Sequence, residues 1–305
     1  EEFPEGIKCQ LIGRVYVEER RKRWAPSWAW VEASKADGTK VLRCVPPPNG
    51  KLEETHPFWQ SKVLGQFPVQ SSAGSLIPLT WIWAAQERTL SPSSPNEIGL
   101  DVGASVDGDP SCLGHRRGPV FRVLWEQREP DTMKTTGRLI QALRETRAER
   151  AKVDYIGVGR GCVDRGREQG EPMHPISVGD ACTRTTCKKC YYEWEDLARD
   201  AKRCQKCGSE YIVKVFANLL SQLWWDVRGL FERGEIDIDP MDGNLADELV
   251  TLSWAPNSKG QTQVSYGRGL SPNRADALLF TFAPVVELSD VTGFFPGAAP
   301  VSVGE

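Results

Sequence analysis

From residue 97 onward the hydrophobic and polar positions follow a regular pattern, which begins with short apolar runs separated by turn-forming residues. The runs at 97–102, 111–115 and 120–125 have the length of strands and are bounded by Gly, Pro and charged residues, which predicts three strands. The Arg-Arg-Gly-Pro turn at 116–119 predicts that the second and third strands form a hairpin.

The pattern then changes to a helical period. Between residues 139 and 146 the apolar positions fall on one face of a predicted helix, and the remaining positions up to residue 150 are mostly charged. Strands are predicted at 153–157 and 174–178, with a helix at 162–169 between them. This order predicts an α/β fold, in which helices pack on a mixed sheet.

The final part of the predicted domain contains two further helices. Apolar residues recur at helical spacing from Phe216 to Phe231, which predicts a helix packed in the core. Residues 264–266 predict an edge strand. The sequence Ser271-Pro-Asn-Arg-Ala-Asp276 is typical of an N-cap and first turn, and the apolar residues after it are expected to continue that helix.

Composition divides the chain into segments. Residues 89–96 have the Ser/Pro content of a linker, which separates a segment at 1–88 from a domain at 97–285, and residues 286–305 predict a flexible tail. The 305 residues are 40% hydrophobic and 26% charged, which excludes general disorder. No apolar run is long enough to cross a bilayer, so no membrane partner is expected. Because the chain begins without methionine, we expect a fragment of a longer protein.

The cysteines give the first specific chemical signal. Five of the nine fall between Cys182 and Cys207, and four of these form the pairs Cys187-Lys-Lys-Cys190 and Cys204-Gln-Lys-Cys207. Two such pairs can complete a tetrahedron of thiolates around one Zn²⁺ at ~2.3 Å. Because four thiolates leave no position for water, this predicts one structural Zn²⁺ in a zinc ribbon, with Cys182 unligated.

The segment around these cysteines is basic. Residues 182–214 hold eight Lys/Arg and five Asp/Glu, although the net charge of the whole chain is −3. The excess fits either an arm that contacts phosphates or an ordinary solvated surface. The candidate DNA contacts are Lys188, Lys189, Arg203, Lys206 and, outside the ribbon, Arg160.

Three acids stand in mostly apolar surroundings. Asp101 ends a predicted strand, Asp154 lies in another, and Asp276 lies in the first turn of the last predicted helix. A buried carboxylate is costly unless it is paired or bound to a metal. If the two strands are neighbours and the helix packs across their ends, the three acids converge, and two Mg²⁺ or Mn²⁺ would relieve their repulsion. Spacing alone leaves open that the acids are unrelated.

Motifs distributed along the chain resemble the large subunit of a tailed-phage terminase. Residues 56–68 and 76–81 are similar to the end of that family's ATPase domain. Residues 98–102, 153–165 and 271–278 are similar, in order, to the family's ribonuclease H-like nuclease motifs. The resemblance implies a ribonuclease H-like fold in which Asp101, Asp154 and Asp276 bind the catalytic metals. It also implies an accessory acid at Asp107 or Asp109, and makes residues 1–88 the end of an ATPase domain.

The chain departs from that family in two respects. The P-loop motif and an apolar strand ending in paired acids are absent, so this chain is not expected to hydrolyse ATP by itself. The predicted ribbon at 182–214 is not part of the usual family pattern, and is interpreted as an insertion between the fifth strand and the long helix.

The leading hypothesis is therefore a Mg²⁺- or Mn²⁺-dependent endonuclease that cuts double-stranded DNA during phage genome packaging. The resemblance implies the portal protein and the terminase small subunit as partners, in the host bacterial cytoplasm at the procapsid portal. One alternative is another ribonuclease H-like nuclease, such as a junction resolvase. A second is a non-catalytic module in which the zinc ribbon docks DNA or protein.

Overall fold

The computed structural model describes residues 14–25, 27–34, 40–45, 59, 63, 74–103, 108–267 and 272–285. They belong to two compact units that divide between Leu79 and Thr80, and each unit is described by itself. Most of the motif at 56–68, Asp107 and the predicted tail at 286–305 lie outside the described residues. In the described part of the chain, no helix has the length and apolar character needed to cross a membrane.

The described residues of the N-terminal unit form one helix and one hairpin. Helix α2 (Arg14–Trp24) precedes β1 (Ala29–Ser34) and β2 (Lys40–Val45), which pair antiparallel. The basic run of this unit lies on α2, where Arg21 forms an ion pair with Glu18 at 2.8 Å. The same Glu18 carboxylate accepts a hydrogen bond from the Trp30 indole, which ties the helix to the hairpin.

The C-terminal unit is built on a six-stranded sheet with the order β11-β5-β4-β3-β6-β7. Its strands are β3 (Asn96–Asp101), β4 (Ser111–Arg117), β5 (Val120–Gln127), β6 (Arg150–Asp154), β7 (Met173–Ile176) and β11 (Asp237–Ile238). Strands β3, β4 and β5 are antiparallel, whereas β6 runs parallel to β3 and β7 runs parallel to β6. The mixed sheet and the hairpin predicted from the sequence are confirmed.

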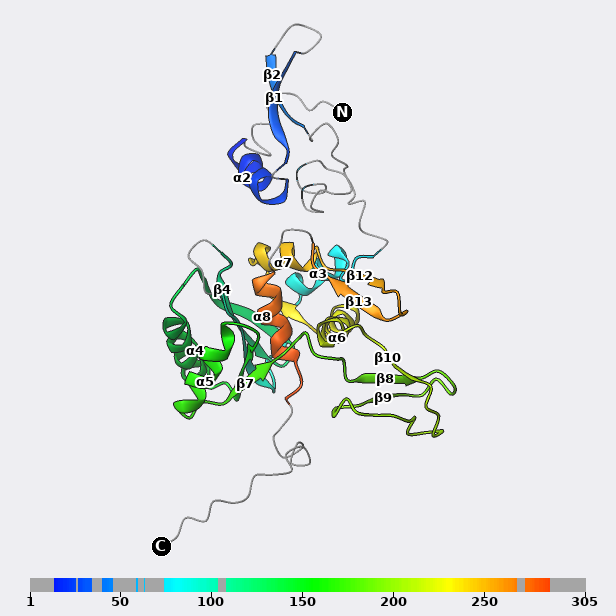
Figure 1. Cartoon of the computed structure of the whole chain (residues 1–305). Helices are drawn as coiled ribbons and strands as arrows, with labels where there is room; N and C mark the ends of the chain where they lie inside the picture. Colours follow the sequence, from blue (N-terminus) through cyan, green and yellow to red (C-terminus); the bar gives the residue numbers. More distant parts are fainter. Residues whose placement is uncertain are drawn as a thin grey trace. The chain divides into compact units, whose positions relative to one another are not determined.

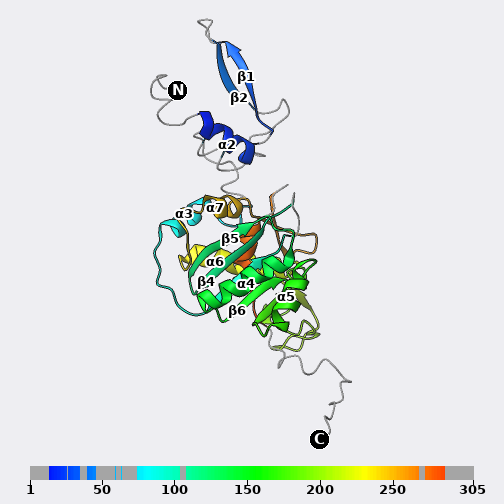
Figure 2. The same cartoon turned by 90° about the vertical axis from the view of Figure 1, so that its left-hand side faces the viewer.

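Helices cover both faces of this sheet (Figures 1 and 2). The described helices of the unit are α3 (Leu79–Glu87), α4 (Thr132–Thr146), α5 (Gly159–Glu168), α6 (Leu219–Arg233), α7 (Gly243–Leu249) and α8 (Asn273–Phe282). Helices α4 and α5 pack on one face, and α8 crosses the opposite face over β3, β4 and β6.

Strand β3 shows how the sequence produces these two layers. Its alternating residues Ile98 and Leu100 are buried in a core formed with α4, α5 and β6. The intervening Gly99 faces α8, where a Cβ atom would lie 2.0 Å from the carbonyl oxygen of Ala277. Only glycine lets the helix approach the strand this closely. Asp101 is two residues further along the same face.

The helix predicted to continue toward residue 150 ends earlier in the structure. Helix α4 begins after the N-cap Asp131 and ends at Thr146, because Arg147 takes a left-handed conformation with φ 52°. The Glu149 amide then donates to the carbonyl of Asn96, so the charged residues up to 150 enter the sheet instead of extending the helix. Strand β6 accordingly starts at 150 and not at 153.

The first residues of the C-terminal unit precede the predicted linker. Gln86 and Arg88 at the end of α3 donate to the carbonyl oxygens of Asp239 and Ile236, at 3.3 and 2.8 Å. The Leu90 amide donates to the carboxylate of Asp237. The compact units therefore divide at Leu79, ahead of the boundary at 88 that composition indicated. The assignment of residues 1–88 to an ATPase domain stays a prediction.

The cysteine-rich segment forms a small sheet of its own. Strands β8 (Arg184–Cys187), β9 (Glu193–Glu195) and β10 (Ile212–Lys214) pair antiparallel in the order β10-β8-β9. This ribbon is inserted between β7 and α6, as predicted (Figure 1). Hydrogen bonds from the Thr183 and Arg184 amides to the Gln222 side chain attach it to α6.

Candidate metal centres

The carboxyl ends of two neighbouring parallel strands carry Asp101 and Asp154. Leu100 on β3 is paired in register with Val153 on β6, so each aspartate is the next residue at the same edge of the sheet. Adjacent strands lie ~4.8 Å apart, which brings the two carboxylates to one site. The condition set by the sequence analysis, that these strands be neighbours, is met.

Helix α8 brings Asp276 to the same edge. Its packing against β3 and β6 lays its first turn across the ends of these strands. The Asp276 carboxylate accepts a short hydrogen bond from the hydroxyl of Tyr266, which follows the β12 (Ser253–Pro256) and β13 (Thr262–Ser265) hairpin. The Trp224 indole donates to that hydroxyl at 3.2 Å. Two elements outside the sheet therefore orient this side chain.

The three acids oppose one another's ionisation. Burial raises the pKa of Asp101 well above its usual range, and repulsion from Asp276 and Asp154 raises it further. Burial also raises the pKa of Asp276 to about 7, although the Tyr266 hydrogen bond opposes this shift. Burial raises the pKa of Asp154, against hydrogen bonds from the Ile156 and Tyr155 amides. Such a cluster favours a bound divalent cation.

The donor set of this site fits a hard cation. No hydrogen bond or ion pair to the Asp101 carboxylate is found among the residues that the structure describes. The three carboxylates do not all lie within 4.8 Å of one another, since the four cysteines are the group of this kind found in the described chain. Asp109 is exposed, and its charge also raises the pKa of Asp101.

Besides Tyr266, two further neighbouring residues were not predicted from the sequence. Glu248 on α7 accepts hydrogen bonds from the Arg274 and Ala275 amides, both at 2.9 Å, and so caps the start of α8. Burial raises its pKa to about 8. Arg274 itself forms ion pairs with Glu126 at 2.6 Å and with Asp242 at 2.5 Å. No sequence motif points to these residues, and only the folded structure places them beside the acidic site.

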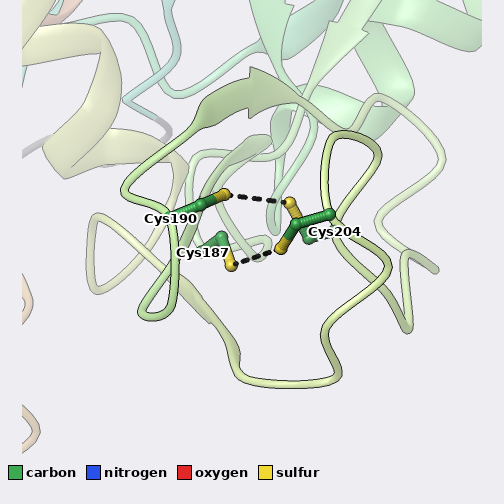
Figure 3. A group of neighbouring side chains, drawn as sticks. Cys187, Cys190 and Cys204 are labelled. Carbon is green, nitrogen blue, oxygen red and sulfur yellow. Dashed lines mark hydrogen bonds between the residues drawn. The ribbon is translucent and has the colours of Figure 1, made fainter.

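The second candidate centre is the set of four cysteines. The sulfur atoms of Cys187, Cys190, Cys204 and Cys207 all lie within 4.8 Å of one another. The Cys187–Cys207 and Cys190–Cys204 sulfur pairs are each 3.6 Å apart, and Figure 3 shows the labelled side chains pointing toward one point. Tetrahedral Zn²⁺ at ~2.3 Å from each sulfur requires about 3.8 Å between sulfurs. The geometry therefore fits a zinc ribbon.

The two turns that hold these cysteines have the same local geometry. The Lys189 and Lys206 amides each donate to the first sulfur of their own pair, Cys187 and Cys204, at 3.4 Å. Although burial opposes ionisation of Cys187, amide hydrogen bonds lower its pKa to about 6. Amide bonds thus favour the thiolate that zinc requires. Cys182 stays outside this group and donates to the carbonyl of Arg184.

The predicted DNA contacts have different surroundings. Lys188, Lys189 and Lys206 are exposed and form no ion pair within the described chain, and the Lys206 ammonium lies over the Tyr192 ring. Arg203 is paired with Glu210 at 2.8 Å. Arg160 lies on α5, where it is near Asp164 and over the ring of Tyr155.

A scan against protein-family models gives no match, and a search of curated proteins gives none. The structure alone defines the class, a mixed α/β fold of the ribonuclease H-like type with acids gathered at one edge of its sheet.

Solved structures specify the fold further. The nuclease domain of the large terminase subunit gp2 of bacterial virus Sf6 matches at 17% identity and a TM-score of 0.55, over 70% of this chain and 100% of that domain. A variant of the same domain with manganese and beta-thujaplicinol matches at 17% identity over 70% and 100%, with a TM-score of 0.52. The large terminase nuclease of thermophilic phage G20c with magnesium has 16% identity, a TM-score of 0.45 and coverage of 68% and 96%. The C-terminal unit therefore has the fold of phage large-terminase nuclease domains.

Proposed function

We propose that this chain carries a metal-dependent endonuclease that cuts double-stranded DNA during phage genome packaging. The observation that supports it is the convergence of Asp101, Asp154 and Asp276 from three elements of a terminase-nuclease fold. One solved structure of that fold contains manganese. The proposal assigns two Mg²⁺ or Mn²⁺ to the acids and one structural Zn²⁺ to the ribbon.

The residues of the acidic site have separate tasks in this proposal. Asp101 and Asp154 hold the cations at the rigid edge of the sheet, and Tyr266 fixes the rotamer of Asp276. Bound divalent cations supply Lewis-acid activation of water and stabilise the charge that develops on the leaving oxygen. Glu248 keeps the first turn of α8 in place through the amides of Arg274 and Ala275. The accessory acid in this proposal is Asp107 or Asp109, and the exposed Asp109 already raises the pKa of Asp101 through its charge.

DNA approaches the acids across exposed cations in this proposal. Arg160 on α5 is the candidate phosphate contact on the body of the unit, and Lys188, Lys189, Arg203 and Lys206 are those on the ribbon. Phosphate contacts position a duplex without reading its sequence, so cleavage should show weak sequence preference.

The partners and the location of the chain follow from the same proposal. It comprises the portal protein and terminase small subunit as partners, the host cytoplasm at the procapsid portal, and residues 1–88 as the end of an ATPase domain.

The test is plasmid cleavage with Mn²⁺ by the whole chain. Asp101→Asn and Asp276→Asn should each lower cleavage by at least about a hundredfold, because each removes a cation ligand while keeping the side-chain volume. Glu145→Gln on α4 is the matched control, since Glu145 is an exposed acid that hydrogen-bonds only Gln141 in the described structure. Wild-type cleavage by either aspartate variant would contradict the mechanism.

Two further measurements separate the alternative functions. Comparing linear duplex with four-way junctions distinguishes a packaging nuclease, which should cut the duplex at least as well, from a junction resolvase. Thermal unfolding with and without Mn²⁺ distinguishes both from a docking module, because only the nuclease should be stabilised by Mn²⁺ in an Asp101-dependent way. Stoichiometric zinc without any Mn²⁺ effect would favour the docking module.

A further inference from the structure

The end of the zinc ribbon combines exposed aromatic rings with unpaired cations. We name this set the aromatic–basic tip, and it consists of Lys188, Lys189, Tyr191, Tyr192, Lys206 and Tyr211. Tyr191 and Tyr211 are 79% and 76% exposed, far more than a ring that contributes to a core. The three lysines form no ion pair among the described residues.

The zinc-binding turns bring these residues together. Lys188, Lys189 and Tyr191 belong to the first turn and Lys206 to the second, and the four sulfurs hold the two turns against each other. The Lys188 amide donates to the carbonyl of Tyr211 at 2.8 Å, which places that residue beside the first turn.

Tyr192 gives the tip a rigid base. Its ring is stacked on Trp194 with centroids 5.9 Å apart and 13° between the planes. Trp194 is buried in the small core of the ribbon with Cys187 and Cys204. Because the Lys206 ammonium lies 5.8 Å from the Tyr192 ring centroid, this cation is held in a defined place.

The backbone at Tyr191 is a second, independent indication. Tyr191 has φ 55°, whereas the equivalent position of the second turn is Gly208 with φ 71°. Both amides donate back to the carbonyl of the first cysteine of their turn, at 2.8 and 2.9 Å. A left-handed conformation is unfavourable for a residue that bears a side chain, and glycine avoids this cost. An exposed tyrosine at such a position indicates a role for its ring beyond folding.

We propose that the aromatic–basic tip binds single-stranded DNA, such as a frayed or newly cut end, by stacking unpaired bases on Tyr191 and Tyr211. Lys188, Lys189 and Lys206 then contact the phosphates of the same strand. Bases in a duplex already stack on one another and offer no free face, whereas unpaired bases stack readily on tyrosine. The site is distinct from the acids of the proposed nuclease, and binding needs neither Mg²⁺ nor Mn²⁺.

The test titrates the whole zinc-loaded chain into a labelled oligothymidylate and measures the fluorescence anisotropy of the label. The buffer contains neither added Mg²⁺ or Mn²⁺ nor a chelator. Tyr191→Gly keeps the left-handed backbone and Tyr211→Ala shortens an exposed ring, so neither should disturb folding. The double variant should bind at least about 25-fold more weakly, since stacking contributes a factor of about 5 or more for each base. The Tyr191→Phe/Tyr211→Phe variant should bind like wild type, because phenylalanine keeps the stacking face.

The lysines are tested by salt dependence. Replacing Lys188, Lys189 and Lys206 by alanine should lower the slope of log Kd against log salt by about 2, at about 0.7 for each phosphate contact. Lys259→Ala, an exposed lysine in the β12–β13 turn, is the control and should leave the slope unchanged. Zinc content and circular dichroism must match wild type in each variant.

Specific outcomes would overturn this inference. They are wild-type affinity in the zinc-loaded tyrosine double variant, equal loss of affinity in the phenylalanine variant, or a loss of duplex affinity in the tyrosine double variant as large as its loss of single-strand affinity. A protein partner would be indicated instead if no DNA bound. Asp101→Asn should retain oligothymidylate binding, so failure of the nuclease proposal and failure of this one give different results.

Discussion

At the scale of single residues, Tyr266 links the acidic site to the rest of the C-terminal unit. Its hydroxyl donates to Asp276 and accepts from Trp224 of α6, so two elements determine one carboxylate rotamer. Partners that orient ligands typically contribute a factor of 10–100 to metal affinity. Tyr266 is therefore the residue whose removal should weaken cation binding without removing a ligand.

We predict that Tyr266→Phe weakens Mn²⁺ binding by about 10- to 100-fold and leaves the zinc content unchanged. The substitution keeps the ring and deletes only the hydroxyl that holds Asp276. The measurement is a titration of the unfolding temperature with Mn²⁺. Ser253→Ala, which deletes an exposed hydroxyl from the same hairpin, serves as the control, and an unchanged Mn²⁺ titration in Tyr266→Phe would remove Tyr266 from the site.

At the scale of elements, the approach of α8 to β3 depends on Gly99. We predict that Gly99→Ala lowers the free energy of unfolding by about 1–3 kcal/mol, because overpacking forces the two elements apart. It should also weaken the response to Mn²⁺, since Asp276 lies on the displaced helix. Gly137→Ala is the matched control, because a Cβ at this exposed α4 position meets no atom within 4 Å. Chemical denaturation measures the free energy of unfolding of both variants. Equal stability of Gly99→Ala and Gly137→Ala would contradict the packing argument.

The ribbon is a second element with its own stability. Its buried core comprises Cys187, Trp194 and Cys204, which is too little apolar surface to fold without a metal. We predict that zinc removal, or Cys204→Ser, abolishes amide hydrogen-exchange protection in β8, β9 and β10 while β3 and β6 stay protected. Retained protection in the zinc-free ribbon would show that the cysteines are not its principal support.

The sequence predicted these elements unequally, for a physical reason. The ribbon followed from Cys-x-x-Cys spacing alone, since each pair is completed within one turn of chain. Asp101, Asp154 and Asp276 required a conditional argument, because only the pairing of β3 with β6 and the path of α8 bring them together. Glu248 and Tyr266 were missed because their hydrogen bonds join elements whose separation in sequence has no periodic signature. The end of α4 was misplaced because Arg147 adopts a left-handed conformation that its residue type does not indicate.

At the scale of the C-terminal unit, charges are sorted along α8. The acids lie at its N-terminus, where the helix dipole favours negative charge. At the other end, the side chains of Arg116 and Lys152 donate to the carbonyl of Thr281 and form ion pairs with buried Glu97 at 2.5 and 2.8 Å. Burial lowers the pKa of Lys152 to about 8, so this lysine remains protonated below that pH. Below pH 8, the pH dependence of the free energy of unfolding therefore comes from groups other than Lys152.

The acidic end of α8 should make the cation-free protein less stable as pH rises. Burial raises the pKa of Asp276 from 3.8 to about 7 and that of Glu248 from 4.5 to about 8. Between its ordinary pKa and its raised pKa, each acid binds more protons in the folded state than in the unfolded state. Their contribution to stability is then lost as pH increases toward 8. His115 has a lowered pKa and acts in the opposite direction up to its ordinary value of 6.5. The window from pH 6.5 to 8 avoids His115, whereas the zinc-free Cys187 thiol, with its pKa lowered to about 6, acts in the opposite direction there.

Isosteric variants isolate this effect from every other titrating group, including the cysteines. Asp276→Asn and Glu248→Gln keep their hydrogen-bond acceptors for Tyr266 and for the Arg274 amide but do not titrate. We predict that each variant gains stability relative to wild type as pH rises from 6.5 to 8 without divalent cations, measured by urea unfolding. Glu145→Gln should show no such trend. Saturating Mn²⁺ should reduce the pH-dependent difference in wild type, because a bound cation stabilises the ionised carboxylates and replaces the protons that the folded state otherwise retains. A variant-to-wild-type difference that does not change with pH would mean that these two acids ionise normally, and burial would then not raise their pKa values as the argument requires.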